Sequence, residues 1–66
     1  MNTYFVNGEG QQMTVQTLGQ LLAALDYEGN WLATAVNGEL VHAVERQSHT
    51  LSDGDRIEIL SPIQGG

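Results

Sequence analysis

The chain has no cysteine and no lysine, and its charge is strongly one-sided. Without cysteine it can form no disulfide, thiolate nucleophile or thiolate metal site, which suits a reducing compartment. Eight carboxylates stand against two cations, Arg46 and Arg56, for a formal net charge of -6. Because nucleic acids and anionic membranes attract clustered Lys and Arg, this balance argues against both as partners. It favours a basic protein partner, although an acidic surface also keeps a small protein in solution.

Long apolar runs are missing as well. The hydrophobic stretches span only a few residues, whereas a membrane-spanning helix needs about 20. The N-terminal residues MNTYFVNG lack the basic region and the apolar core of a signal peptide. A chain of 66 residues has room for one domain. We therefore expect one soluble, cytoplasmic domain.

Two β segments are expected at the start of the chain. Residues 3–6 (TYFV) are rich in β-forming side chains and lead into the turn-rich residues 7–10. Residues 12–15 alternate polar and apolar side chains, which predicts a second strand antiparallel to the first. The side chains expected to face the core are Tyr4, Val6, Met13 and Val15.

A helix is expected next, because the apolar period changes from two to about 3.6. Thr17 and Gln20 match a capping box, in which two side chains satisfy unpaired backbone N–H groups reciprocally. Residues 28–30 (Glu-Gly-Asn) are expected to end the helix. One apolar stripe follows the cap, formed by Leu18, Leu21, Leu22 and Leu25.

The second half of the chain predicts three more strands. Residues 32–36 and 39–41 are joined by Asn37-Gly38, a strong signal for a tight hairpin. Residues 43–50 are polar and are expected to form an irregular loop. After a turn at Asp53-Gly54, residues 56–60 form a strand with Ile57 and Ile59 inward, and Pro62 ends it.

This order of elements predicts an α+β fold of the β-grasp, or ubiquitin-like, type. A single helix must bury its apolar stripe against the sheet, so we expect it to lie across one face. The crossover makes the first and last strands parallel neighbours within a mixed sheet of four to five strands. We expect the domain to cover residues 1–61 and a flexible Gly-Gly tail to cover residues 62–66.

Catalysis by side chains of this domain is not expected. No nucleophile–base pair stands out, and so small a domain has little room for a deep pocket. His42 and His49 are too few for a zinc site and are interpreted as surface residues. Three carboxylates near the last strand lack the ligand count of a calcium site and are interpreted as turn-formers and partner-facing charge: Asp53, Asp55 and Glu58.

The chain end is the candidate functional site. Two terminal glycines occur by chance in about 0.5% of chains, at a glycine frequency of roughly 7%, although chain ends are often disordered and free to vary. The Gly66 carboxylate could attack the α-phosphate of ATP and become an acyl-adenylate. Glycine lacks a Cβ, so the tail could thread a narrow channel and approach a nucleotide closely. A sulfur nucleophile would then leave a thiocarboxylate.

The chain resembles the ThiS-type sulfur carriers of thiamine biosynthesis over nearly its whole length. The resemblance rests on residues 17–22 (TLGQLL), 35–41 (AVNGELV), 51–59 (LSDGDRIEI) and 62–66 (PIQGG). The Gly-Asp-x-Ile-x-Ile pattern before Gly-Gly is shared with other β-grasp sulfur carriers, including the MoaD type of molybdopterin synthesis. The short length and the Val-Asn-Gly-Glu-x-Val hairpin favour the ThiS type.

The resemblance implies a protein cosubstrate rather than an enzyme. A ThiF-like adenylyltransferase would use MgATP to adenylate Gly66, and sulfur from a cysteine desulfurase or another persulfide donor would convert it to a thiocarboxylate. A ThiG-like thiazole synthase would consume that sulfur. The tail residues Ile63, Gln64 and Gly65 would contact the partner active sites, and the carrier itself would bind no cofactor. The alternatives are a carrier for another pathway, such as molybdopterin synthesis, and a ubiquitin-like binding or conjugation module.

Overall fold

The computed structural model describes residues 1–27 and 32–60, which form one sheet, an α-helix and a short 3-10 helix. The strands are β1 (Asn2–Val6), β2 (Glu9–Met13), β3 (Ala33–Val36), β4 (Glu39–Val41) and β5 (Arg56–Leu60). The helices are α1 (Leu18–Ala24) and η1 (Ala43–Glu45). The described part contains no helix long and apolar enough to cross a membrane.

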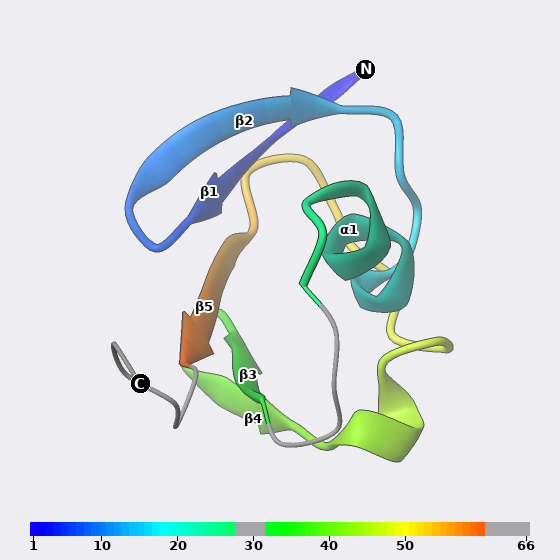
Figure 1. Ribbon diagram of the computed structural model, residues 1–66. Coiled ribbons are helices and arrows are strands. Elements are labelled where there is room, and N and C mark those ends of the chain that lie inside the picture. The colour runs from blue at the N-terminus through cyan, green and yellow to red at the C-terminus, as the bar shows by residue number, and fades with distance from the viewer. Residues whose placement is uncertain (28–31, 61–66) are drawn as a thin grey trace.

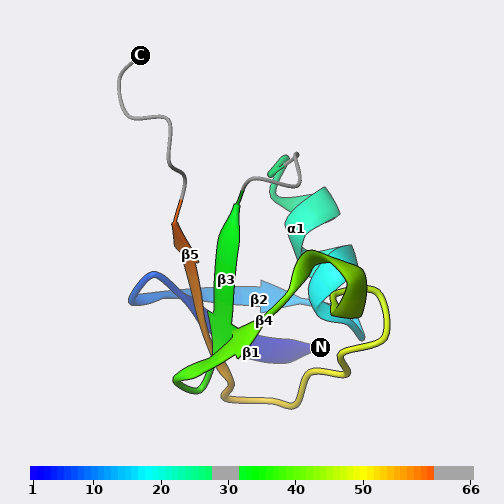
Figure 2. The same ribbon diagram turned by 90° about the horizontal axis from the view of Figure 1, so that it is seen from below.

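The five strands form a mixed sheet in the order β2-β1-β5-β3-β4. The last strand, β5, lies in the middle, parallel to β1 and antiparallel to β3. Helix α1 lies across one face of this sheet, as two perpendicular views show (Figures 1 and 2). This arrangement confirms the predicted β-grasp fold, with one helix on a mixed five-stranded sheet.

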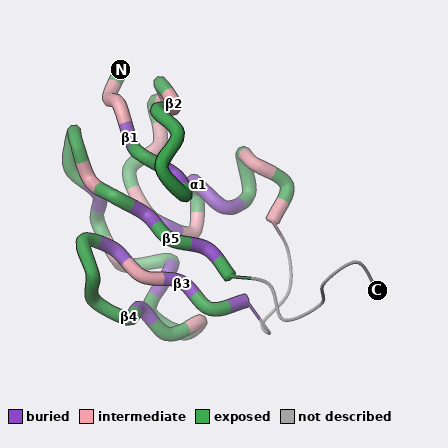
Figure 3. Tube along the Cα trace, turned by 90° about the vertical axis from the view of Figure 1, so that its left-hand side faces the viewer, coloured by how far each residue is buried: buried purple, intermediate pink, exposed green. Residues whose placement is uncertain are grey.

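The core lies between α1 and the sheet. Along β5 buried and exposed residues alternate, with Ile57 and Ile59 turned inward (Figure 3). Met13 and Val15 pack against the edge of the core and are half-buried. The buried apolar side chains, which include three of the four predicted helix leucines, are Tyr4, Val6, Leu18, Leu21, Leu22, Leu32, Val36, Val41, Leu51, Ile57 and Ile59.

The predicted helix cap is present in part, and the predicted helix end is wrong. The Thr17 hydroxyl accepts a hydrogen bond from the Gln20 N–H (3.2 Å), as expected of an N-cap. The Gln20 side chain, however, accepts from the N–H of Gln16 (2.7 Å), one residue before the cap. The helix ends at Ala24, before the predicted stop at residues 28–30, which lie outside the described residues. Asp26 adopts a left-handed backbone (φ 67°), which cannot continue a right-handed helix.

Both hairpins reverse over an Asn-Gly pair. Asn7-Gly8 and Asn37-Gly38 all have positive φ, the conformation that a two-residue type I′ turn requires. The second hairpin confirms the prediction. In the first, the turn is tighter than predicted: Val6 pairs directly with Glu9, so β2 occupies residues 9–13 instead of 12–15.

The segment predicted as an irregular loop, residues 43–50, contains η1 and a buried arginine. Arg46 is 7% exposed. Its Nε donates to Thr34 Oγ1 (3.0 Å), and its Nη2 donates to the carbonyl of Leu32. The carbonyl of Arg46 accepts from the N–H of Gly19 (2.9 Å), which ties this segment to the start of α1. The prediction failed because the sequence shows a polar residue in a polar segment, and only the packing makes it part of the interior.

Candidate functional site

The candidate site begins where β5 ends. The predicted tail residues, Ile63, Gln64, Gly65 and Gly66, lie outside the described residues, as does the predicted boundary between a domain of residues 1–61 and a tail of residues 62–66. The structure does describe the strand that carries them. Leu60, the last residue of β5, pairs with Ala33 of β3. The tail therefore follows directly from the central strand of the sheet.

The sheet face turned away from α1 carries exposed apolar side chains around this strand. Phe5 of β1 alternates with the buried Tyr4 and Val6, and it is 41% exposed. Leu60 is 70% exposed and Leu40 of β4 is 61% exposed. We call these three side chains the apolar patch. Contiguous exposed apolar surface is typical of contacts with another protein, and Phe5 and Leu60 of this patch line one common groove.

A groove on this face connects part of the apolar patch with charged residues. Phe5 and Leu60 line it together with Arg56 and Glu58, the outward-facing residues of β5. Asn7 and Gly8 of the first hairpin turn also line it. The groove thus combines apolar surface with one charge of each sign, directly beside the residue from which the tail departs.

Of the three carboxylates predicted to form turns, Asp55 supports a turn, whereas the prediction is wrong for Glu58, which lies within β5 with its side chain exposed because alternate residues of a strand face outward. Asp53 Oδ1 accepts from the N–H of Thr3 (2.7 Å). Asp55 accepts from the N–H of Ser52 through Oδ2 (2.8 Å) and from Asn37 Nδ2 through Oδ1 (3.0 Å). Both side chains therefore hold the approach to β5 in place. A role as charge that faces a partner stays a prediction.

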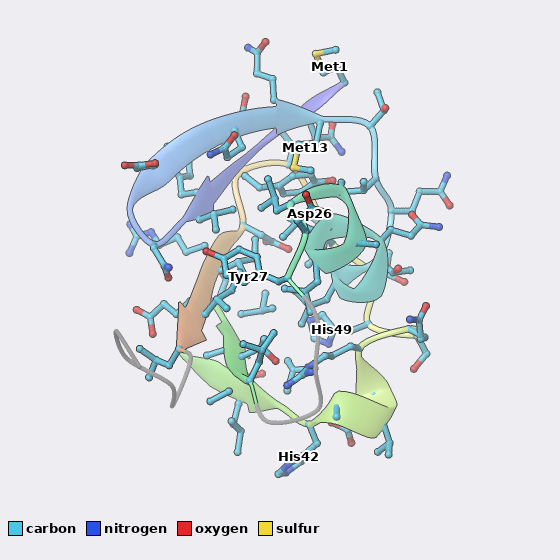
Figure 4. All side chains as sticks on the ribbon, viewed as in Figure 1. Met1, Met13, Asp26, Tyr27, His42 and His49 are labelled. Atoms are coloured by element: carbon cyan, nitrogen blue, oxygen red, sulfur yellow. The ribbon has the colours of Figure 1, made fainter. Side chains whose placement is uncertain are left out.

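The two histidines lie well apart. His42 precedes η1 and points away from the body of the domain, whereas His49 lies near α1 (Figure 4). The His49 carbonyl accepts from the N–H of Leu18 (3.0 Å), so its backbone is part of the helix start. Among residues 1–27 and 32–60, no group of three or more histidine, aspartate or glutamate side chains could hold a metal ion.

The mixed five-stranded sheet with one helix across its face places this protein in the β-grasp, or ubiquitin-like, class. Within that class, the model of the ThiS family matches residues 4–66, which is nearly the whole chain and includes the Gly-Gly end. The chain belongs to the ThiS family.

Relatives and solved structures agree with this assignment. The chain is 31% identical over 62 residues to the "Sulfur carrier protein ThiS" of Thermus thermophilus, covering 94% of this chain and 97% of the relative. It is also similar to the crystal structure of the thiamine biosynthesis protein ThiS from Geobacter metallireducens, with a TM-score of 0.80 and 26% identity over 97% of this chain and 99% of that one. A solution structure of a thiamine biosynthesis protein from the same organism gives a TM-score of 0.79, also at 26% identity, over 97% of this chain and 87% of that one.

Proposed function

We propose that this protein is a sulfur carrier of thiamine biosynthesis whose working group is the Gly66 carboxylate. The observation that carries the proposal is the ThiS family match, which runs through the C-terminal Gly65-Gly66. The relative from Thermus thermophilus, named as a sulfur carrier protein, supports it. The protein would act as a cosubstrate, since its own part in the chemistry is to present a chain end.

Adenylation and sulfur transfer on the partner enzymes load the carrier. The Gly66 carboxylate oxygen attacks the α-phosphorus of ATP, the bond to pyrophosphate breaks, and an acyl-adenylate forms. A ThiF-like adenylyltransferase supplies the MgATP site for this step. The terminal sulfur of a persulfide, supplied by a cysteine desulfurase or another persulfide donor, then attacks the acyl carbon and displaces AMP, which gives an acyl disulfide. A second thiol attacks the donor sulfur of this disulfide, so that a new disulfide forms on the donor side and the thiocarboxylate is released at Gly66. A ThiG-like thiazole synthase uses the thiocarboxylate sulfur to form the thiazole.

This mechanism gives the folded domain and the C-terminal tail separate roles. Residues 1–61 form the body that docks, and residues 62–66 form the tail that enters the partner active site. Ile63, Gln64 and Gly65 contact the channel, and the absence of a Cβ on glycine allows the backbone to approach the nucleotide closely. Phe5 and Leu60 of the apolar patch, and the groove that they line, support docking of the body, because Leu60 is the last residue of the strand that leads into the tail. The net charge of -6 favours a basic surface on the partner. We place these reactions in the cytoplasm.

Intact mass spectrometry tests the proposal. The protein is incubated with MgATP, a ThiF-like adenylyltransferase and a sulfur source, and the expected product has one oxygen of the terminus replaced by sulfur. A variant that lacks Gly66 serves as the control and should remain unmodified. Failure of the wild-type chain to form an adenylate or a thiocarboxylate would contradict the proposal.

Sulfur transfer to a molybdopterin synthase but not to a thiazole synthase would assign the carrier to another pathway. Full function with residues appended after Gly66 would favour the binding module.

A further inference from the structure

The pairing between β1 and β5 stops before β5 does. Phe5 pairs with Arg56 and Val6 with Ile57, and the ladder bonds run from the Phe5 N–H to Asp55 O and from the Asn7 N–H to Ile57 O (both 2.9 Å). The main chain then turns away at Asn7-Gly8 to form β2. By the spacing of a parallel ladder, the next bond would join the Ile59 N–H to the Asn7 carbonyl.

The side chain of Asn7 makes that bond in place of the main chain. Asn7 Oδ1 accepts from the N–H of Ile59 (2.9 Å), and Asn7 Nδ2 donates to the carbonyl of the same residue (3.2 Å). The planar carboxamide therefore presents one acceptor and one donor to Ile59, in place of the two backbone groups that a continued parallel strand would supply from two of its residues. Asparagine also suits the backbone here, because Asn7 has φ 50°, which asparagine tolerates better than most residues. One residue both reverses the chain and extends the ladder.

This contact holds the end of the strand that carries the tail. At the level of Ile59, β5 is paired with Thr34 of β3 on one side and with the Asn7 carboxamide on the other. Only Leu60 follows within β5. If the Asn7 side chain were lost, the last residues of β5 would be paired on one side only. The pairing of Leu60 with Ala33 would remain, but without a partner on the β1 side the end of β5 would separate from the sheet more often.

We propose that Asn7 is a positioning residue for the tail: its carboxamide anchors Ile59 and so sets the point from which the C-terminal residues depart. This inference rests on the proposed function. A partner that docks on the sheet face must receive the Gly66 carboxylate at a set distance from the docked body. Each released residue adds up to about 3.3–3.6 Å of reach and further conformational freedom to the chain. If the end of β5 is released, a smaller fraction of docked carriers places the Gly66 carboxylate at the nucleotide. The chemistry of a carboxylate that is bound there stays unchanged.

The second Asn-Gly turn provides a matched control. Asn37 also has a positive φ (53°), and its side chain also reaches β5: Oδ1 accepts from the N–H of Arg56 (3.0 Å), and Nδ2 donates to Asp55 Oδ1. It holds the start of the strand, at the end opposite to the tail. Substitution by glycine removes either side chain and keeps the positive φ unstrained. Asn7→Gly and Asn37→Gly therefore remove similar bonds at opposite ends of one strand.

Amide hydrogen exchange, measured residue by residue on the full chain, tests the anchor. In Asn7→Gly we expect the exchange of the Ile59 amide to rise about tenfold more than that of Ile57, as the loss of a hydrogen bond predicts. In Asn37→Gly the increase should fall on Arg56 and spare Ile59. An Ile59 amide that remains as protected in Asn7→Gly as in the wild type would overturn the anchor.

Steady-state adenylation tests the positioning role. With a ThiF-like adenylyltransferase and saturating MgATP, Asn7→Gly should raise the KM for the carrier roughly three- to tenfold and keep kcat within about twofold, because ordering a released residue costs free energy on binding. Asn37→Gly should leave KM near the wild-type value. An unchanged KM in Asn7→Gly, or an equal rise in both variants, would overturn the positioning role. A wild-type chain that is not adenylated at all would overturn the proposed function instead, and the exchange of Ile59 would still decide whether Asn7 anchors the strand.

Discussion

Replacing Arg46 by alanine is expected to destabilise this domain severely. Most arginine side chains are exposed, and their substitution changes stability little, but this one is buried. The guanidinium is nearly buried, and it donates to Thr34 Oγ1 and to the carbonyl of Leu32. Thr34 Oγ1 in turn donates to the carbonyl of Val41 (2.7 Å), so Arg46 belongs to a buried network that joins η1, β3 and β4. The substitution removes the charged donor and leaves its acceptors in a largely dry site.

The expected loss is about 3 kcal/mol. Hydrogen bonds to charged groups are worth about 1.5–3 kcal/mol each, and partial rehydration of the Leu32 carbonyl reduces the sum. Stability of about 0.05–0.15 kcal/mol per residue gives the whole domain roughly 3–10 kcal/mol. A loss of this size therefore consumes a third or more of the total. It corresponds to a fall in Tm of roughly 12–24 °C, at about 4–8 °C per kcal/mol for a domain of this size.

Urea denaturation followed by circular dichroism measures this loss, and the other arginine provides the control. Arg56 is exposed on β5, and it bonds to Asn37 through its backbone N–H. Arg56→Ala removes the same charge and should change the free energy of unfolding by less than about 0.5 kcal/mol. If Arg46→Ala costs less than about 1 kcal/mol, or no more than Arg56→Ala, the guanidinium does not stabilise the interior and the reasoning above is wrong.

Three further predictions concern the helix and the chain end. Leu22→Ala should lower the free energy of unfolding by about 2–5 kcal/mol, because it leaves a cavity under α1. Ala23→Ser on the exposed side of the helix is the control, and equal losses of stability in urea titrations would contradict the assignment of Leu22 to the buried face. Thr17→Ala should cost about 0.5–2 kcal/mol through loss of the cap to the Gln20 N–H, and a thermal melt identical to that of the wild type would contradict the cap. Deletion of Gly66 should leave Tm nearly unchanged, because chain ends contribute little burial, and should abolish adenylation; a large fall in Tm would show that this residue is packed.

Local patterns in the sequence predicted most of the fold. The 3.6-residue period of the leucines identified the helix face, since Leu18, Leu21 and Leu22 are buried. The Asn37-Gly38 pair identified a hairpin because few residue pairs adopt two consecutive positive φ angles readily. Predicted boundaries were less accurate. The first turn proved shorter than its run of turn-forming residues suggested, because pairing of Val6 with Glu9 needs only two residues to reverse the chain.

The sequence by itself determined the class of fold, the inward face of β5 and the chemical interest of the Gly-Gly end, because these follow from periodicity and from the absence of side chains on glycine. Tertiary structure alone decided the burial of Arg46 and the contact of Asn7 with Ile59, residues 52 positions apart. The physical reason is the same in both cases. The partners of a polar side chain are set by which distant backbone groups are left unpaired when the sheet assembles, and a linear pattern does not contain that information.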